Sequence, residues 1–190
     1  MAWAIWITGL PGSGKTTLAR RVEARLQARG VPVRVLELDE IRKIVTPEPS
    51  YSAQEREILY GALAYMGSLL TEVGWNVIID ATGHLRRYRD RARALVPVFG
   101  EVYLDCPLEL CRQREGARVG GHAPARIYAR SGRPGATVPG VDVPYEISPR
   151  PELTLRGDVP PDQAAARVLQ LIAQMSGEGK PGTPGGGCDV

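Results

Sequence analysis

The chain has 190 residues, of which 43% are hydrophobic, and a formal net charge of only +3. This length and composition suffice for one domain with its own core, and the small charge disfavours a dedicated nucleic-acid binder. Three cysteines match neither a disulfide framework nor paired zinc spacing, and no segment resembles a signal peptide or a membrane span. We therefore expect a soluble cytoplasmic protein whose partners are small anions, without nucleic acid or membrane.

The first predicted elements flank a glycine-rich loop. The apolar run at residues 3–8 predicts a buried strand, and the apolar spacing from Thr17 onward predicts an amphipathic helix. Between them a complete G-x-x-x-x-G-K-[ST] sequence turns from strand to helix, so its backbone N–H groups and lysine should bind phosphates. The alternative is a glycine-rich turn that binds nothing. The predicted ATP-binding residues are Gly9, Leu10, Pro11, Gly12, Ser13, Gly14, Lys15, Thr16 and Thr17.

Strands and helices then alternate along the chain, which predicts an α/β fold with a parallel sheet and ligands at the carboxyl ends of its strands. This is a three-layer arrangement with five strands. The further strands are expected at 33–38, 76–80, 101–105 and 152–155. The further helices are expected from Glu40, over 52–70, 85–96 and 107–114, and at 160–175.

Two segments lack this periodicity. Residues 116–151 are rich in glycine, proline and arginine, and a connection of that length within a compact domain is usually functional. We interpret this segment as a lid that closes over substrate. Residues 177–190 are of low complexity and are expected to be disordered, so the single domain should span residues 1–176.

Two acidic residues end predicted strands and should lie at the ligand-binding edge. Asp39 is our candidate for the carboxylate that orients or deprotonates an acceptor hydroxyl, with a helix cap as the alternative. Asp80 is a candidate for holding a magnesium-bound water, with a cap or turn residue as the alternative. Thr16 is the candidate Mg²⁺ ligand, because phosphate-binding loops place a hydroxyl on that ion.

Arginines are the candidate anion contacts. Arg42 lies one helical turn beyond Asp39, so both should face one crevice, and Arg56 is a second candidate with an exposed helix face as its alternative. Arg112 and Arg114 precede the lid, where arginines can clamp a transferring phosphoryl group. The arginines between residues 86 and 93 are spaced too closely to face one ligand, so most of them should be solvated. His84 and His122 are too few and too far apart to predict a metal site.

Several further sequence blocks are distinctive. Residues 36–42 read L-E-L-D-E-I-R and residues 51–56 read Y-S-A-Q-E-R. Residues 102–115 read V-Y-L-D-C-P-L-E-L-C-R-Q-R-E, and residues 140–146 read G-V-D-V-P-Y-E. Together with the phosphate-binding loop, these blocks resemble those of the adenylylsulfate (APS) kinases, a family of P-loop kinases.

The resemblance implies an ATP-dependent kinase that phosphorylates the 3′-hydroxyl of adenosine 5′-phosphosulfate for sulfate assimilation, with ATP as donor, Mg²⁺ as cofactor and a possible homodimer. It implies catalytic roles for Asp39, Lys15 and Arg114, because Arg114 matches the arginine of the family's P-L-E-x-C-x-x-R block. It implies acceptor binding by Asp39 together with Arg42, Tyr51 and Arg56.

The chain departs from the family pattern at Leu59, at residues 82–87 and at Val138. The resemblance assigns these positions to the adenosine side of the acceptor pocket. Two alternatives therefore stand beside APS phosphorylation. One is a related P-loop kinase acting on another nucleotide conjugate or a small polar alcohol, and the other is a non-catalytic ATP-binding regulatory module.

Overall fold

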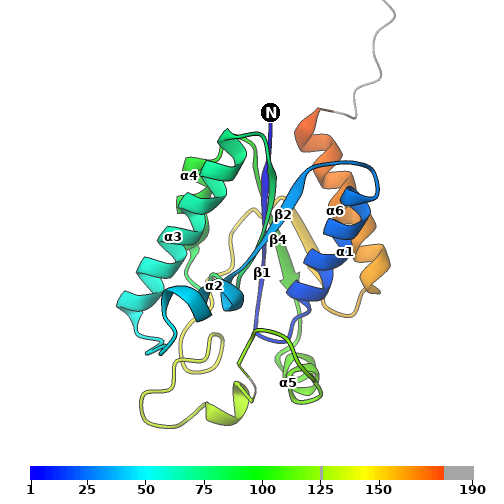
Figure 1. Ribbon diagram of the computed structural model, residues 1–190. Coiled ribbons are helices and arrows are strands. Elements are labelled where there is room, and N and C mark those ends of the chain that lie inside the picture. Colours follow the sequence, from blue (N-terminus) through cyan, green and yellow to red (C-terminus); the bar gives the residue numbers. More distant parts are fainter. Residues whose placement is uncertain (125, 178–190) are drawn as a thin grey trace, which may run out of the picture.

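Five parallel strands, in the order β2-β3-β1-β4-β5, form the centre of the molecule, with helices on both faces (Figure 1). The structure is a computed structural model, and it describes residues 1–124 and 126–177. This architecture confirms the predicted three-layer α/β fold with a five-stranded parallel sheet. The strands are β1 (Ala4–Gly9), β2 (Val33–Glu37), β3 (Asn76–Asp80), β4 (Phe99–Asp105) and β5 (Leu153–Arg156).

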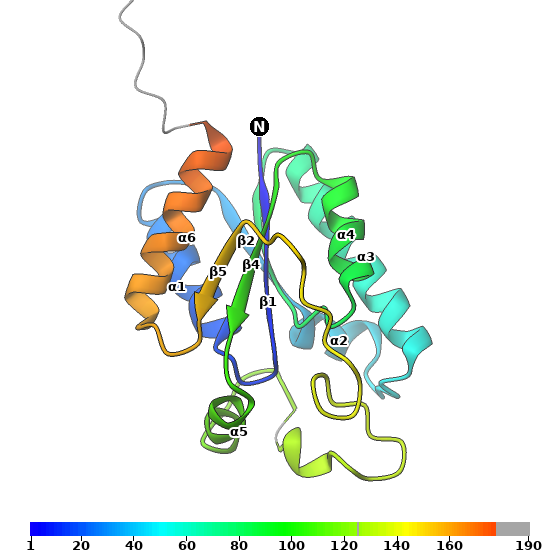
Figure 2. The ribbon, with the colours of Figure 1, turned by 180° about the vertical axis from the view of Figure 1, so that it is seen from behind.

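Each face of the sheet carries its own helix pair, as Figures 1 and 2 show from opposite sides. The strand β1 alternates between the two layers, because Ile5 and Ile7 belong to one buried cluster whereas Ala4 and Trp6 belong to the other. Apolar side chains on both faces are typical of a central parallel strand. The first cluster includes side chains of α1 (Lys15–Gln27) and α6 (Pro161–Ser176), and the second includes those of α3 (Ala53–Glu72) and α4 (Arg86–Leu95).

Two shorter helices lie beside the carboxyl ends of the strands. The helix α2 (Leu38–Val45) follows β2 directly, and α5 (Leu108–Gly116) follows β4. The predicted boundaries agree within two residues, and α2 begins at Leu38 rather than at Glu40. Its earlier start places Asp39 inside the first helical turn.

The start of α3 has a modified form of the capping box. The Ser52 hydroxyl accepts a hydrogen bond from the N–H of Glu55 at 3.2 Å, which is the expected N-cap. The Glu55 carboxylate, however, accepts from the N–H groups of Ser50 and Tyr51 at 2.5 and 3.0 Å. This arrangement holds Tyr51 in a left-handed conformation with φ of 55°, an uncommon state for an aromatic residue.

The connection between α5 and β5 runs past the carboxyl edge of the sheet (Figure 1). Its described residues contain one short 3₁₀ helix, Tyr128–Arg130, and one isolated bridge between Pro139 and Val143. We call residues 116–151 the lid segment below. Of the predicted tail, residues 178–190 lie outside the described residues. Across the part of the chain that is described, no helix is both long and apolar enough to cross a membrane.

Candidate active site

The loop between β1 and α1 adopts a backbone that requires glycine. Gly12 has a φ of 78°, and a Cβ atom there would lie 2.3 Å from the carbonyl oxygen of Cys111. Gly14 has a φ of 100° and serves as the N-cap of α1 without a side chain. The glycines therefore let the chain turn tightly into α1. Backbone N–H groups at the N-terminus of a helix can bind an anion.

Lys15 follows this loop as the first residue of α1. Its ammonium group donates hydrogen bonds to the carbonyl oxygens of Gly9 and Leu10 at 3.2 and 3.0 Å. Burial lowers the pKa of Lys15, and the nearby carboxylates of Asp80 and Asp39 oppose that shift. A lysine between two carboxylates and a phosphate-binding loop is suited to bridge phosphate oxygens.

A cavity of about 680 Å³ opens beside this loop at the carboxyl ends of the strands. Its walls come from the phosphate-binding loop, from α2, from the end of β3 and from the lid segment. Gly9, Leu10 and Ser13 do not line it, because Gly9 ends β1 and Ser13 is buried. The other predicted site residues do line it: Pro11, Gly12, Gly14, Lys15, Thr16, Thr17, Asp39, Arg42, Tyr51, Arg56, Asp80 and Arg114.

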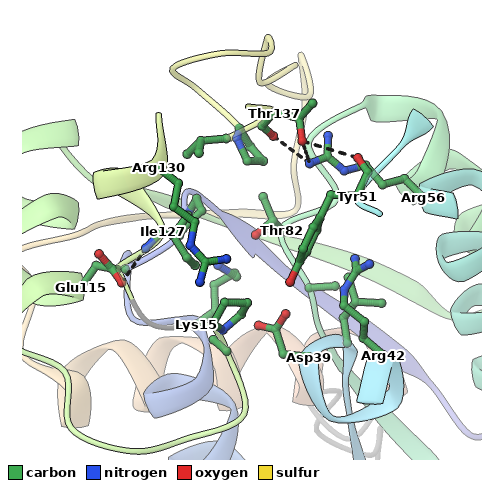
Figure 3. A pocket seen from close by; sticks show the side chains of 18 of the residues that line it. Lys15, Asp39, Arg42, Tyr51, Arg56, Thr82, Glu115, Ile127, Arg130 and Thr137 are labelled. Carbon is green, nitrogen blue, oxygen red and sulfur yellow. Dashed lines mark hydrogen bonds between the residues drawn. The ribbon is translucent and has the colours of Figure 1, made fainter. Parts of the chain in front are cut away.

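Neither predicted acid acts as a helix N-cap. Asp39 lies in the first turn of α2, whose N-cap is Glu37, and Leu85 is the N-cap of the helix that follows Asp80. Asp39 faces the cavity beside Lys15 (Figure 3). The two acids are therefore available to a ligand, in agreement with the functional alternative for each.

Asp80 is almost completely buried at the end of β3. Burial raises the pKa of Asp80 to about 6, although Lys15 and a hydrogen bond with the Thr16 hydroxyl act in the opposite direction. One of its carboxylate oxygens, Oδ2, has no hydrogen-bond partner among the described residues. A buried carboxylate oxygen without a partner calls for a ligand, since such groups are costly to leave unsatisfied.

Arg42 forms a buried ion pair with Glu55, and its guanidinium lies 4.8 Å from the centre of the Tyr51 ring. The pair joins α2 to the start of α3. Figure 3 shows the hydroxyl end of Tyr51 directed toward Asp39. Arg42 therefore supports one aromatic wall of the cavity, and its charge is already balanced by Glu55.

Arg56 reaches across the cavity to the lid segment. Its Nη2 donates hydrogen bonds to the carbonyl and hydroxyl oxygens of Thr137 at 2.7 and 2.8 Å. Only 8% of Arg56 is exposed, so the solvated-face alternative is wrong for this residue. The contact joins α3 to a segment 81 residues further along the chain.

Arg114 and Arg112 lie in different environments. The Arg114 guanidinium lies 3.5 Å from the carbonyl oxygen of Ser13 and lines the cavity. Arg112 is instead paired with Glu109 on the exposed side of α5. The structure thus places only the preferred arginine beside the phosphate-binding loop.

The lid segment contributes cavity residues that the site prediction omitted. Arg130 projects from the lid toward Lys15 and Asp39, and Thr82 lies on the opposite wall (Figure 3). The hydroxyl of Tyr128 donates to the carbonyl of Pro11 at 2.7 Å, which joins the lid directly to the phosphate-binding loop. The A-R pair at 129–130 is the sequence signal that would have identified Arg130.

Arg89 is the exception among the arginines between residues 86 and 93, most of which were expected to be solvated. Its side chain is fully buried, and its Nε lies 3.1 Å from the Glu101 carboxylate. It also donates to the backbone carbonyls of Gly83 and Glu146. Arg89 therefore ties the turn after β3 to the end of the lid segment.

The positions that depart from the family pattern lie in different environments. Leu59 is fully buried in the core between α3 and the sheet, and neither it nor His84 lines the cavity. His84 lies in a loop but is only 4% exposed, and it packs against Tyr88 with ring centres 5.6 Å apart. Val138 and Thr82 are the exceptions, because both line the cavity. The departures at Leu59 and His84 therefore change the packing behind the pocket rather than its surface.

The parallel sheet, the glycine loop with Lys15 and the lid over a shared cavity define a P-loop kinase. The chain matches the family model for adenylylsulphate kinase over residues 1–156. It therefore belongs to the adenylylsulphate kinase family, whose members transfer a phosphoryl group to a hydroxyl.

Individual relatives agree with this assignment. The chain is 32% identical over 170 residues to an adenylyl-sulfate kinase of Synechococcus sp. (strain JA-3-3Ab), covering 90% of this chain and 91% of that protein. It is 33% identical over 177 residues to a probable adenylyl-sulfate kinase of Pyrococcus abyssi, covering 91% and 96% of the two chains.

Among solved structures, the APS kinase CysC of Mycobacterium tuberculosis in complex with AMPPNP and APS superposes with a TM-score of 0.79. Its sequence is 30% identical, and the match covers 90% of this chain and 97% of that one. The similarity thus includes the lid segment as well as the sheet.

Proposed function

We propose that this protein transfers the γ-phosphoryl group of ATP to the 3′-hydroxyl of adenosine 5′-phosphosulfate, giving 3′-phosphoadenosine 5′-phosphosulfate and ADP. The observation that supports this proposal most directly is the meeting of Lys15, Asp39 and the lid residue Arg130 in one cavity. A donor site, an acceptor carboxylate and positive charge beside the transferring group are the parts that phosphoryl transfer needs. The family relationship supplies the identity of the acceptor.

The donor side of the reaction depends on residues 9–17. Backbone N–H groups of the loop and Lys15 bind the β- and γ-phosphates, and Lys15 exchanges its present carbonyl contacts for phosphate oxygens. Arg114, beside the loop, and Arg130, from the lid, stabilise the negative charge on the transferring group. The bond between the γ-phosphorus and the bridging oxygen to the β-phosphate breaks, and ADP leaves.

On the acceptor side, Asp39 accepts the proton of the attacking hydroxyl as its oxygen bonds to the γ-phosphorus. Tyr51 and Val138 line the same cavity, so they provide apolar surface for the adenosine base. Arg56 approaches from α3, where its positive charge favours the negatively charged phosphosulfate group. Arg42 contributes to acceptor binding from α2 by supporting the Tyr51 ring, since Glu55 balances its charge.

The residues also fit a Mg²⁺ ion, which would neutralise the phosphates and polarise the transferring group. A hydroxyl and a carboxylate are the oxygen donors that this ion prefers, and Oδ2 of Asp80 has no partner within the described structure. We propose that Thr16 binds the ion directly and that Asp80 holds one of its water ligands.

Two further features stay proposals. A homodimer is supported by large hydrophobic side chains that α3 exposes, among them Ile58 and Tyr65 at 58% and 57% exposure, and sedimentation would measure it. A reducing compartment is supported by Cys106 and Cys111, which are buried and free.

The acceptor is tested by measuring ADP release with APS, with other nucleotides and with sugar alcohols at saturating MgATP. APS-dependent release is expected. Release on another acceptor alone would contradict APS phosphorylation, and ATP binding with no release on any acceptor would indicate a regulatory module.

The role of Asp39 is tested separately with Asp39→Asn. Turnover should fall by roughly 100- to 10,000-fold, the usual contribution of a general base, while the dissociation constant for ATP stays within about twofold. Retained turnover with weakened ATP binding would show that Asp39 serves the donor instead.

A further inference from the structure

The part of the lid that faces the acceptor closes around a single carboxylate. Asp142 accepts hydrogen bonds from the N–H of Gly132 through Oδ1 and from the N–H of Val138 through Oδ2, both at 2.9 Å. The carbonyl of Val138 in turn accepts from the N–H groups of Val141, Asp142 and Val143 at 3.1, 2.9 and 3.3 Å. We call residues 132–143 the lid loop. Each oxygen of Asp142 thus bonds the backbone of this loop, and Asp142 itself does not line the substrate cavity.

The lid loop has no helix and no strand to order it, only the isolated bridge between Pro139 and Val143. Its other internal backbone hydrogen bonds run from the N–H of Ala136 to the carbonyl of Arg133 at 2.9 Å and from the N–H of Gly140 to the carbonyl of Val143 at 2.8 Å. Gly132, Gly135 and Gly140 all adopt positive φ, between 74° and 80°. Glycines in that conformation give a chain many alternatives in its free state, so ordering the loop has a large entropic cost. Two hydrogen bonds to a charged carboxylate are a strong local means of offsetting that cost.

The lid loop presents Thr137 and Val138 to the cavity, and the N–H of Val138 is one of the two groups that Asp142 bonds. Thr137 receives both hydrogen bonds from Arg56, and its hydroxyl lies 3.4 Å from the carbonyl of Tyr51. Val138 lines the cavity. A displacement of the Val138 backbone would therefore move one wall of the acceptor site and the lid's contact with α3 together.

We propose that Asp142 is a positioning residue for the acceptor: it preforms the lid loop so that Thr137 meets Arg56 and Val138 faces the base. The proposal rests on the proposed function for the identity of the acceptor, whereas the order of the loop is independent of it. Because Asp142 bonds neither the phosphate-binding loop nor Lys15, its effect should fall on the acceptor and spare ATP.

The test uses Asp142→Asn in the full chain. Asparagine keeps one oxygen and replaces the other by an N–H₂ group, which faces a backbone N–H and cannot accept from it. The KM for APS should rise about tenfold or more, while the KM for ATP and the melting temperature stay near the wild-type values. Asp158→Asn is the matched control, because Asp158 pairs with Arg156 at 2.6 Å on the exposed end of β5.

Hydrogen exchange supplies a readout that a change of acceptor would not affect. Peptides covering residues 132–143 should exchange faster in Asp142→Asn than in the wild type or in Asp158→Asn, with peptides of α1 and β1 unchanged. Unchanged exchange in the lid loop would overturn the proposal, as would faster exchange with an unaltered KM for the acceptor. If the wild type does not phosphorylate APS, the proposed function fails, and the exchange experiment with the acceptor found in its place still decides the role of Asp142.

Discussion

The guanidinium of Arg42 is neutralised by the carboxylate of Glu55, in an ion pair whose side chains are only 8% and 10% exposed. The same carboxylate accepts hydrogen bonds from the N–H groups of Ser50 and Tyr51. One acidic side chain therefore fixes an arginine of α2 and the backbone beneath the aromatic wall of the acceptor pocket.

Replacing Glu55 by glutamine should destabilise the protein by about 3 kcal/mol, because it leaves a buried arginine without its counter-charge. It should also raise the KM for the acceptor, since Tyr51 loses its backbone support. Urea unfolding and steady-state kinetics measure the two effects. Glu57→Gln, on the same helix, is the control: its pair with Arg87 is largely exposed, so the loss should stay within about 1 kcal/mol. Equal losses for the two variants would contradict the assigned role of burial.

Arg130 should act on the transferring group rather than on nucleotide binding alone. For Arg130→Met we expect kcat to fall about 100-fold or more, because a cation aimed at developing charge stabilises the transition state more than the ground state. Stopped assays of ADP formation at saturating substrates give kcat directly. Arg150→Met, at an exposed position near the end of the lid segment, should keep wild-type kcat. A change confined to the KM for ATP would instead show that Arg130 only helps to bind the nucleotide and does not stabilise the transition state.

Removal of Mg²⁺ with a chelator should abolish turnover and restored Mg²⁺ should return it. In Asp80→Asn the Mg²⁺ concentration for half-maximal activity should rise about tenfold, as is usual when an outer-sphere carboxylate is lost. A titration of activity against free Mg²⁺ measures this shift. An unchanged midpoint of the Mg²⁺ titration together with a lower kcat would show that Asp80 acts on Lys15 rather than on the ion.

His84 should make the fold sensitive to acid. Burial, reinforced by the nearby Arg56 and Arg87, lowers the pKa of His84 from 6.5 to about 4. The unfolded chain therefore takes up a proton at this site below pH 6.5, whereas the folded protein does so only below about pH 4. Stability is lost across that interval as the pH falls.

The expected size of this effect is about 2 kcal/mol between pH 7 and pH 4.5. Urea unfolding of the wild type and of His84→Asn at both pH values isolates it, because the asparagine variant should lose about that much less on acidification. Parallel losses in the two proteins would show that His84 is already protonated in the folded state.

Local patterns sufficed to predict the fold and the position of the glycine-rich loop at the edge of the sheet. The strand before Gly9, the helix after Lys15 and the acid at the end of β3 are each set by a few neighbouring residues, and parallel topology then brings the strand ends together. The fit of Gly12 against Cys111 could not be predicted, because it depends on the packing of segments that are distant in the sequence.

The contacts of the lid were also beyond the sequence pattern. The pairing of Arg56 with Thr137 and the burial of Arg89 join segments tens of residues apart, and periodicity within one helix carries no information on such partners. On α4, the five arginines between residues 86 and 93 suggest a solvated face. Only the folded chain shows that one of these side chains turns inward against Glu101.

The close packing at Gly12, which leaves no space for a Cβ atom, joins the phosphate-binding loop to α5. The carbonyl of Cys111 occupies the space that a Cβ atom of residue 12 would need. The phosphate-binding loop therefore packs directly against α5, the helix that also bears Arg114. Arg114 therefore reaches the phosphate-binding loop through the packing of α5 and not through the lid segment. Under the proposed roles, the charge of Arg114 is built into the donor site itself, whereas the charge of Arg130 depends on where the lid segment lies.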